Sequence, residues 1–174
     1  RSFQASAPDP HKYGLSAKGN LYFTLFKLKY RKHQYFVTSY WPGGLYGTPG
    51  LSGSRTGVYI ASAWISMMKL GTKGYRENAK LLRDTTVFMA KELRALGFEV
   101  FGEPNICIIS FRHKKYSVNK VQKFMKNRGW GLALLQKPLS IHFSFTPLNC
   151  LKRDEMLKDL KECVEFLEKN SSSQ

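Results

Sequence analysis

The stretch between Tyr40 and Gly57, YWPGGLYGTPGLSGSRTG, places the strictest limit on how this chain can fold. It holds six glycines and two prolines in eighteen residues, a composition that favours neither a helix nor a central strand. We therefore expect a long loop here, and loops of this length in a compact domain usually carry function. The aromatic side chains of Tyr40, Trp41 and Tyr46 predict that this loop is packed.

Helices and strands are predicted to alternate on both sides of this loop. Hydrophobic patterns and turn residues predict strands at 21–27, 34–38, 98–102, 105–111 and 140–146, and helices at 58–71, 75–97, 117–129 and 153–169. The first helix is apolar on almost every side, which predicts an exposed apolar patch that drives dimerisation or aggregation. The order of the final third predicts helices packed against one face of a sheet.

The chain is strongly basic, with a net charge of +16 from 28 Lys and Arg against 12 Asp and Glu. A basic surface attracts phosphates, whether in nucleic acid, in anionic lipid or in a small substrate. Here the positive charge is spread over several segments, which argues against a nucleic-acid or membrane-surface module with a single basic face. We expect no nucleic-acid partner, and we interpret the excess charge as balanced by an absent partner.

Cysteine and histidine spacing excludes two other kinds of site. The three cysteines are odd in number and far apart, which fits neither a disulfide framework nor a zinc site. Among the four histidines, no spacing is typical of metal ligands. We therefore expect reduced thiols, a cytosolic compartment and no metal.

Lys12 is the residue whose surroundings in the sequence suggest covalent chemistry with a carbonyl group. A lysine attacks a carbonyl only as the neutral amine, which burial or neighbouring cations favour. His11 precedes Lys12, and Lys18 lies six residues beyond it. The product of such an attack is an imine, although a two-residue match is common and indicates this role only weakly.

Two longer motifs resemble the sphingosine-1-phosphate lyase family, which is part of the fold type I, group II decarboxylase-like pyridoxal 5'-phosphate (PLP) enzymes. The family pattern D-x-H-K-Y-G-x-x-x-K-G is matched by Asp9, His11, Lys12, Tyr13, Gly14, Lys18 and Gly19. The pattern W-x-G-G-x-Y-x-S/T-P-x-x-x-G-S-R is matched by Trp41, Gly43, Gly44, Tyr46, Thr48, Pro49, Gly53, Ser54 and Arg55. With the segments that follow, the resemblance covers nearly the whole chain.

The resemblance implies a role for each candidate site residue. Lys12 forms the Schiff base with PLP and His11 lies near the cofactor phosphate, while Lys18 acts on the substrate side in phosphate binding or proton movement. The remaining implied contacts are to the cofactor phosphate, from Gly47 and Thr48, and to the substrate, from Tyr46, Ser54 and Arg55. A buried salt bridge that holds the loop is an equally good interpretation of Arg55.

The resemblance also implies an α/β architecture, the C-terminal part of a fold type I subunit. Residues 1–57 are expected to end the large PLP-binding domain, 58–97 to form linking helices, and 98–174 to form a small α+β domain. Pro8 and Pro10 flank Asp9 and predict an irregular or edge strand before Lys12. The groups that contact the cofactor ring are expected in a missing N-terminal half.

The implied activity is retro-aldol cleavage of a phosphorylated sphingoid base, sphingosine or sphinganine 1-phosphate, to a long-chain aldehyde and phosphoethanolamine. A homodimer with a shared active site is expected, on the cytosolic face, either anchored at the endoplasmic reticulum by a segment outside this chain or free in the cytoplasm. Two alternatives remain: a truncated, catalytically incomplete homologue that acts through subunit binding, and a related PLP-dependent amino-acid decarboxylase.

Overall fold

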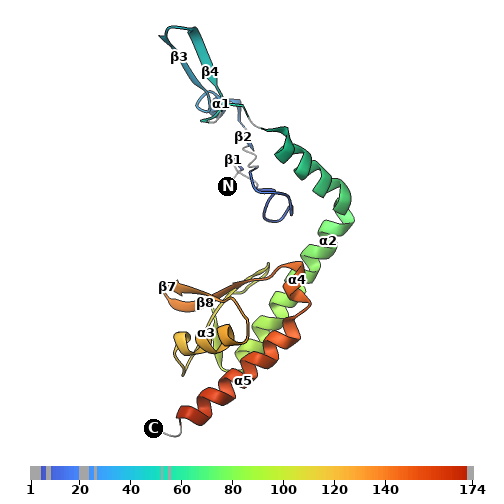
Figure 1. Cartoon of the computed structure of the whole chain (residues 1–174), viewed down its shortest axis with the longest axis vertical. Coiled ribbons are helices and arrows are strands. Elements are labelled where there is room, and N and C mark those ends of the chain that lie inside the picture. Colours follow the sequence, from blue (N-terminus) through green and yellow to red (C-terminus); the bar gives the residue numbers. More distant parts are fainter. Residues whose placement is uncertain are drawn as a thin grey trace. The chain divides into compact units, whose positions relative to one another are not determined.

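The chain divides into two compact units, Arg1–Tyr75 and Arg76–Gln174. The computed structural model describes residues 5–6, 9–19, 24–25, 27–51, 53–54 and 56–171. Figure 1 shows the helices and strands of both units, with all of the helices and most of the strands labelled. The helix α2 (Gly57–Ala95) contains the boundary between the units, so each unit is considered by itself. The predicted division at residues 57 and 97 stays a prediction.

The first unit is built from short elements. Strands β1 (Ala5–Ser6) and β2 (Thr24–Leu25) pair in antiparallel fashion on either side of the segment that carries Lys12. One helical turn, α1 (Leu28–Arg31), follows β2. The predicted strand at 21–27 is observed only as β2, because residues 20–23 and 26 lie outside the described residues.

A β-hairpin replaces the first part of the predicted glycine-rich loop. Strand β3 (Phe36–Trp41) extends the short strand predicted at 34–38, and β4 (Gly44–Thr48) pairs antiparallel to it. The two-residue turn between them is followed by Gly44 at φ 91°, a conformation that glycine adopts at little cost. The prediction of a loop without secondary structure from Tyr40 to Gly57 is therefore wrong up to Thr48.

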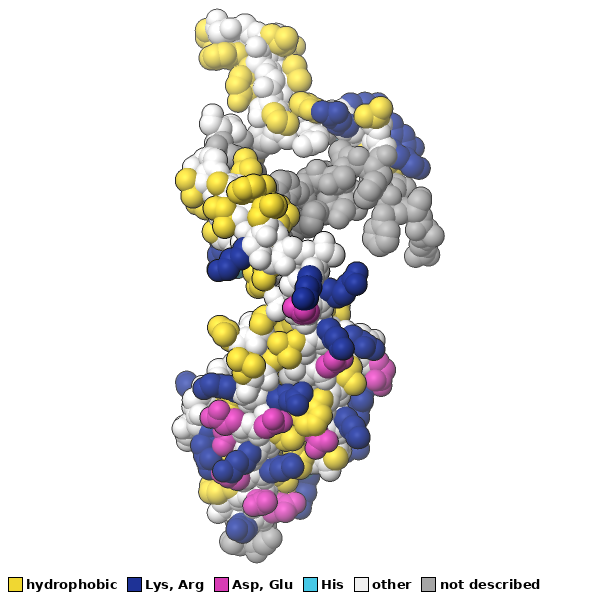
Figure 2. Space-filling model, turned by 90° about the vertical axis from the view of Figure 1, so that its right-hand side faces the viewer, with side chains coloured by type: hydrophobic (Ala, Val, Ile, Leu, Met, Phe, Trp, Pro, Cys, Tyr) yellow, Lys and Arg dark blue, Asp and Glu magenta, His cyan; other side chains and the backbone are white. Residues whose placement is uncertain are grey.

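Helix α2 joins the two predicted helices across a kink. Gly71, predicted to end the first helix, has φ 57° and ψ −179°, so the helical geometry is interrupted there. Figure 2 shows hydrophobic side chains gathered on the N-terminal half of α2. The exposed ones are Val58, Tyr59, Ile60, Trp64, Ile65, Met67 and Met68. The predicted apolar patch is therefore present on this half of the helix.

The first unit buries very little of its own surface. Among its described residues, only Ser16 and Ala63 are buried. A unit of this size needs a buried apolar core to offset the entropy lost on folding. The described part of the first unit lacks such a core, so its exposed apolar residues suit contact with further protein surface.

The second unit is an antiparallel sheet with helices packed on one face, as predicted. Its strand order is β5 (Phe98–Val100), β6 (Ile108–His113), β8 (Leu139–Ser144) and β7 (Ala133–Gln136). The helices are the end of α2, α3 (Val118–Asn127), α4 (Pro147–Cys150) and α5 (Arg153–Ser171). Strand β7 and helix α4 were not predicted.

One continuous core holds this unit together. Its largest fully buried side chains include Met89 of α2, Phe111 of β6, Met125 of α3, Ile141 of β8 and Leu160 of α5. All three cysteines, Cys107, Cys150 and Cys163, are buried. Burial raises the pKa of the Cys163 thiol to about 11, so this thiol is protonated at neutral pH.

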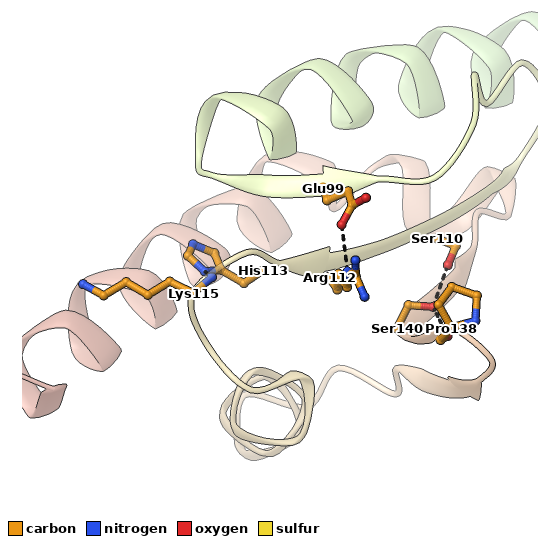
Figure 3. Close-up of polar contacts among 7 residues, drawn as sticks. All are labelled: Glu99, Ser110, Arg112, His113, Lys115, Pro138 and Ser140. Carbon is orange, nitrogen blue, oxygen red and sulfur yellow. Dashed lines mark hydrogen bonds and ion pairs between the residues drawn. The ribbon is translucent and has the colours of Figure 1, made fainter.

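Polar side chains occupy the other face of the sheet, because successive strand residues point to opposite faces. Figure 3 shows Arg112 of β6 directed at Glu99 of β5, with Nε donating to Oε2 at 2.7 Å. The hydroxyls of Ser110 and Ser140 lie 3.1 Å apart across β6 and β8. None of the helices in the described part of the chain combines the length and the hydropathy that spanning a bilayer requires.

Candidate active site

The segment from Asp9 to Gly19 forms a tight turn around Lys12. The backbone N–H of Lys12 donates to the Asp9 carbonyl at 3.2 Å, and that of Ser16 donates to the Pro10 carbonyl at 3.1 Å. The carboxylate of Asp9 also accepts a hydrogen bond from the backbone N–H of His11, at 3.0 Å. These bonds place His11 and Lys12 within a turn, with the adjoining strand β1 ending at Ser6.

The amine of Lys12 projects from this turn beside one carboxylate. Its Nζ lies 3.8 Å from Oδ2 of Asp9, and its side chain is 71% exposed. At this exposure the ion pair is weak, so it orients the amine without sequestering it. Asp9 matches the family motif, but no pattern in the sequence assigns it this role.

The ring of His11 is held by the same turn. Its Nδ1 lies 2.9 Å from the carbonyl oxygen of Ser16, which can only accept, so Nδ1 carries the proton. In the neutral ring, Nε2 is then left as an acceptor. The bond fixes both the orientation and the tautomer of His11.

Helix α2 clamps the far side of the turn. The hydroxyl of Tyr75 donates to the Gly14 carbonyl at 2.9 Å, and that of Ser66 donates to the Leu15 carbonyl at 3.3 Å. A Cβ at Gly14 would lie 2.5 Å from the Pro10 carbonyl oxygen, so only glycine fits there. Tyr75 and Ser66 were not identified from the sequence, because neither belongs to a motif and both lie more than fifty residues from the turn.

Lys18 lies at the end of the same segment and is exposed. Gly19, which follows it, has φ 122°, and a Cβ there would lie 3.0 Å from the ring of Tyr59 on α2. The structure thus brings His11, Lys12 and Lys18 into one turn that α2 supports.

Three further candidates lie together on β4 of the hairpin. Tyr46 pairs with Thr38, Gly47 with Val37 and Thr48 with Phe36. The hydroxyl of Thr48 donates to the Gly50 carbonyl at 2.8 Å, which holds the chain as it leaves the strand.

Two candidates lie beyond the hairpin. Ser54 is exposed in the segment that leads to α2, and Arg55 lies outside the described residues. The candidates therefore fall into three segments: the turn from Asp9 to Gly19, which we call the lysine turn, the hairpin strand β4, and the segment that leads to α2. Their roles toward a ligand stay predictions.

The donor set of the lysine turn suits a ligand that has both an aldehyde and an anionic group, as PLP does. Lys12 offers an exposed amine for the aldehyde, and its turn leaves the Nε2 of His11 available. The cation of Lys18 suits phosphate oxygens. Among the residues described, no group of His, Cys, Asp and Glu side chains could hold a metal ion.

No protein-family model matches the chain. A sphingosine-1-phosphate lyase of Arabidopsis thaliana is 36% identical over 163 residues, which cover 93% of this chain and 30% of that protein. The solved structure of a sphingosine-1-phosphate lyase from Burkholderia pseudomallei matches with a TM-score of 0.86 at 34% identity, over 93% of this chain and 37% of the other.

A glutamate decarboxylase structure from Lactobacillus brevis shares the fold. It matches with a TM-score of 0.74 at 19% identity, over 92% of this chain and 40% of the other. The predicted fold class is confirmed: the chain has the α/β architecture of the matching part of fold type I enzymes. The chain spans about 30% of the length of the curated relatives that it matches. On this similarity, the chain belongs to the sphingosine-1-phosphate lyase family.

Proposed function

We propose that this chain supplies the lysine turn and the small α+β domain of a PLP-dependent carbon–carbon lyase. Its substrate would be a phosphorylated sphingoid base, cleaved to a long-chain aldehyde and phosphoethanolamine. The observation that supports this most is the exposed Lys12 amine in a turn clamped by α2, in a chain related to sphingosine-1-phosphate lyases. At 19% identity, the decarboxylase likeness supports the fold alone.

Lys12 would hold the cofactor through its amine. PLP, when bound, supplies an electron sink for the pair of electrons that the broken carbon–carbon bond leaves behind. The weak ion pair with Asp9 would keep the amine oriented before the cofactor arrives, and it costs little to break because the Lys12 side chain is largely exposed. The bonds from Tyr75 and Ser66 would hold the turn in place while the cofactor and substrate bind.

The other candidates would bind the charged ends of the ligands. His11 would accept a hydrogen bond through Nε2, because its Nδ1 proton is already committed to Ser16. Lys18 would attract the phosphate of the substrate as a compact cation. On β4, Gly47 and Thr48 would contact the cofactor phosphate, and Tyr46 would line the substrate side. Ser54 and Arg55 remain candidates for the substrate end.

A homodimer with a shared active site accompanies this proposal. The apolar half of α2 is exposed along its length, and the described part of the first unit buries almost nothing. Both features suit burial against a second subunit or the rest of a longer subunit. The same surface supports the second candidate function, in which the chain acts by binding a full-length subunit without catalysis of its own.

The proposal is tested on the native protein purified from its source. Borohydride reduction in the presence of PLP should fix the cofactor on the peptide that contains PHKYG, and aldehyde should be released from sphinganine 1-phosphate. Lys12→Ala should lose both signals, whereas Lys18→Ala should keep the label and turn over more slowly. Stable association with a full-length subunit, without label or turnover, would favour the second candidate function.

A further inference from the structure

The positive charge of the chain is unevenly distributed between the two units. The first unit contains ten Lys and Arg and a single acidic residue, Asp9. The next acidic residue along the chain is Glu77, in the second unit. From the whole sequence, the positive charge was expected to be spread over several segments. In the second unit, Lys and Arg side chains form ion pairs with carboxylates, but the first unit has almost no acidic side chains for such pairs.

The densest part of this charge is α1 and the residues beside it. Lys27, Lys29, Arg31 and Lys32 fall within six residues, all of them exposed. We call this segment, together with the residues as far as Val37, the α1 patch. Figure 2 shows Lys and Arg side chains gathered at α1 with no acidic side chain beside them in that view.

Tyrosines orient two of these cations. The Nζ of Lys29 lies 5.0 Å from the centre of the Tyr30 ring, and the guanidinium of Arg31 lies 5.9 Å from that of Tyr35. Arg31 also donates to the Tyr35 hydroxyl at 3.2 Å. The rings therefore hold the cations at the surface in place of carboxylates.

Exposed apolar side chains accompany the cations. Leu28, in the middle of the basic run, is 82% exposed, and Phe36 and Val37 are exposed at the start of β3. A lone exposed leucine needs no explanation, but one surrounded by cations and followed by exposed aromatic and branched residues is typical of a membrane-interface segment.

We propose that the α1 patch binds the surface of anionic phospholipid membranes. Clustered Lys and Arg are attracted to the negative surface potential, tyrosines favour the headgroup region, and Leu28 can enter the acyl boundary. Nucleic acid fits less well. Base stacking needs open aromatic faces, and cations already lie over Tyr30 and Tyr35. The α1 patch shares no residue with the lysine turn, although its Phe36 and Val37 pair with Thr48 and Gly47 on β4; membrane binding is therefore tested without cofactor or substrate.

Vesicle flotation tests this proposal on the full chain, without cofactor or substrate. Vesicles of phosphatidylcholine alone are compared with vesicles that also contain about 30% phosphatidylserine. We expect binding to the anionic vesicles only, weakening as salt rises from about 50 mM to about 300 mM. Replacing Lys27, Lys29, Arg31 and Lys32 by glutamine should reduce partitioning on the order of 1,000-fold.

A matched control removes the same charge elsewhere. Lys114, Lys120, Lys123 and Lys126 are exposed in the second unit, and their replacement by glutamine should leave binding within a few fold of the parent chain. Leu28→Ser should weaken binding to anionic vesicles while leaving all the charge in place.

Three results would overturn the proposal. Equal loss in both glutamine variants would mean that net charge, and not the α1 patch, drives binding. Unchanged vesicle binding of the variant with four glutamines in the α1 patch would show that the patch does not bind the membrane. Tighter binding of single-stranded RNA than of anionic vesicles, lost in the α1-patch variant, would assign the patch to nucleic acid.

Discussion

Gly14→Ala tests whether the turn around Lys12 depends on the close approach seen between Gly14 and Pro10. The new Cβ would lie 2.5 Å from the Pro10 carbonyl oxygen, 3.0 Å from its Cα and 3.1 Å from its carbonyl carbon. All three atoms are backbone, so no side-chain rotation can relieve the overlap. The turn must open by several tenths of an ångström, at a cost of about 1–3 kcal/mol.

Opening the turn would weaken the backbone hydrogen bond between Ser16 and Pro10, and amide exchange measures that bond directly. The backbone N–H of Ser16 donates to the same Pro10 carbonyl at 3.1 Å, and the Ser16 side chain is buried. A cost of about 1–3 kcal/mol corresponds to exchange of the Ser16 amide proton that is roughly 5 to 150 times faster. Amide exchange read by NMR or by mass spectrometry of a peptide that covers the turn measures this change.

A matched substitution separates the local effect from a general one. Gly131→Ala adds the same methyl group where nothing lies within 4 Å, in the second unit, and should leave the exchange of Ser16 unchanged. Unchanged exchange in Gly14→Ala as well would refute the account of the turn, because the methyl group would then fit without displacement.

Three further outcomes are expected. Asp159→Ala should lower the free energy of unfolding by about 2 kcal/mol in urea denaturation, because the indole N–H of Trp130 loses an acceptor at 2.7 Å; exposed Glu155→Ala is the control, and equal loss in both would contradict the assignment. Burial lowers the pKa of His113 from 6.5, so stability should fall as pH drops below about 6.5, where the unfolded state binds more protons; an unchanged slope in His113→Gln would show that another group is responsible. Met68→Glu should abolish self-association in analytical ultracentrifugation, and a parent chain that is already monomeric would count against the apolar half of α2 as an interface.

The second unit could be predicted largely from the sequence, because its patterns agree with its contacts. The helix at 117–129 and the strand at 140–146 follow apolar periodicity, and both bury that face in one core. Helix α4 was missed although Thr146, Pro147 and Asn149 form a capping box with proline at the start of the helix. Strand β7 was missed because its residues are exposed and do not alternate with polar ones.

The first unit was predicted less well, since its structure depends on details that periodicity does not carry. Six glycines predicted a loop, yet the turn before Gly44 lets the strands on each side pair into a hairpin. The motifs identified His11 and Lys12, but the bonds from Ser66 and Tyr75 that hold their turn span 51 and 61 residues. Contacts over such distances cannot be read from a local pattern.

The attachment point of PLP tests the central claim most directly. The native protein is incubated with PLP, reduced with borohydride and digested, and the labelled residue is identified by mass spectrometry. The account predicts the label on Lys12, its loss in Lys12→Ala and its retention in Lys18→Ala. A label on Lys18, or the same labelling in Lys12→Ala as in the parent protein, would contradict the assignment of Lys12 as the residue that holds the cofactor.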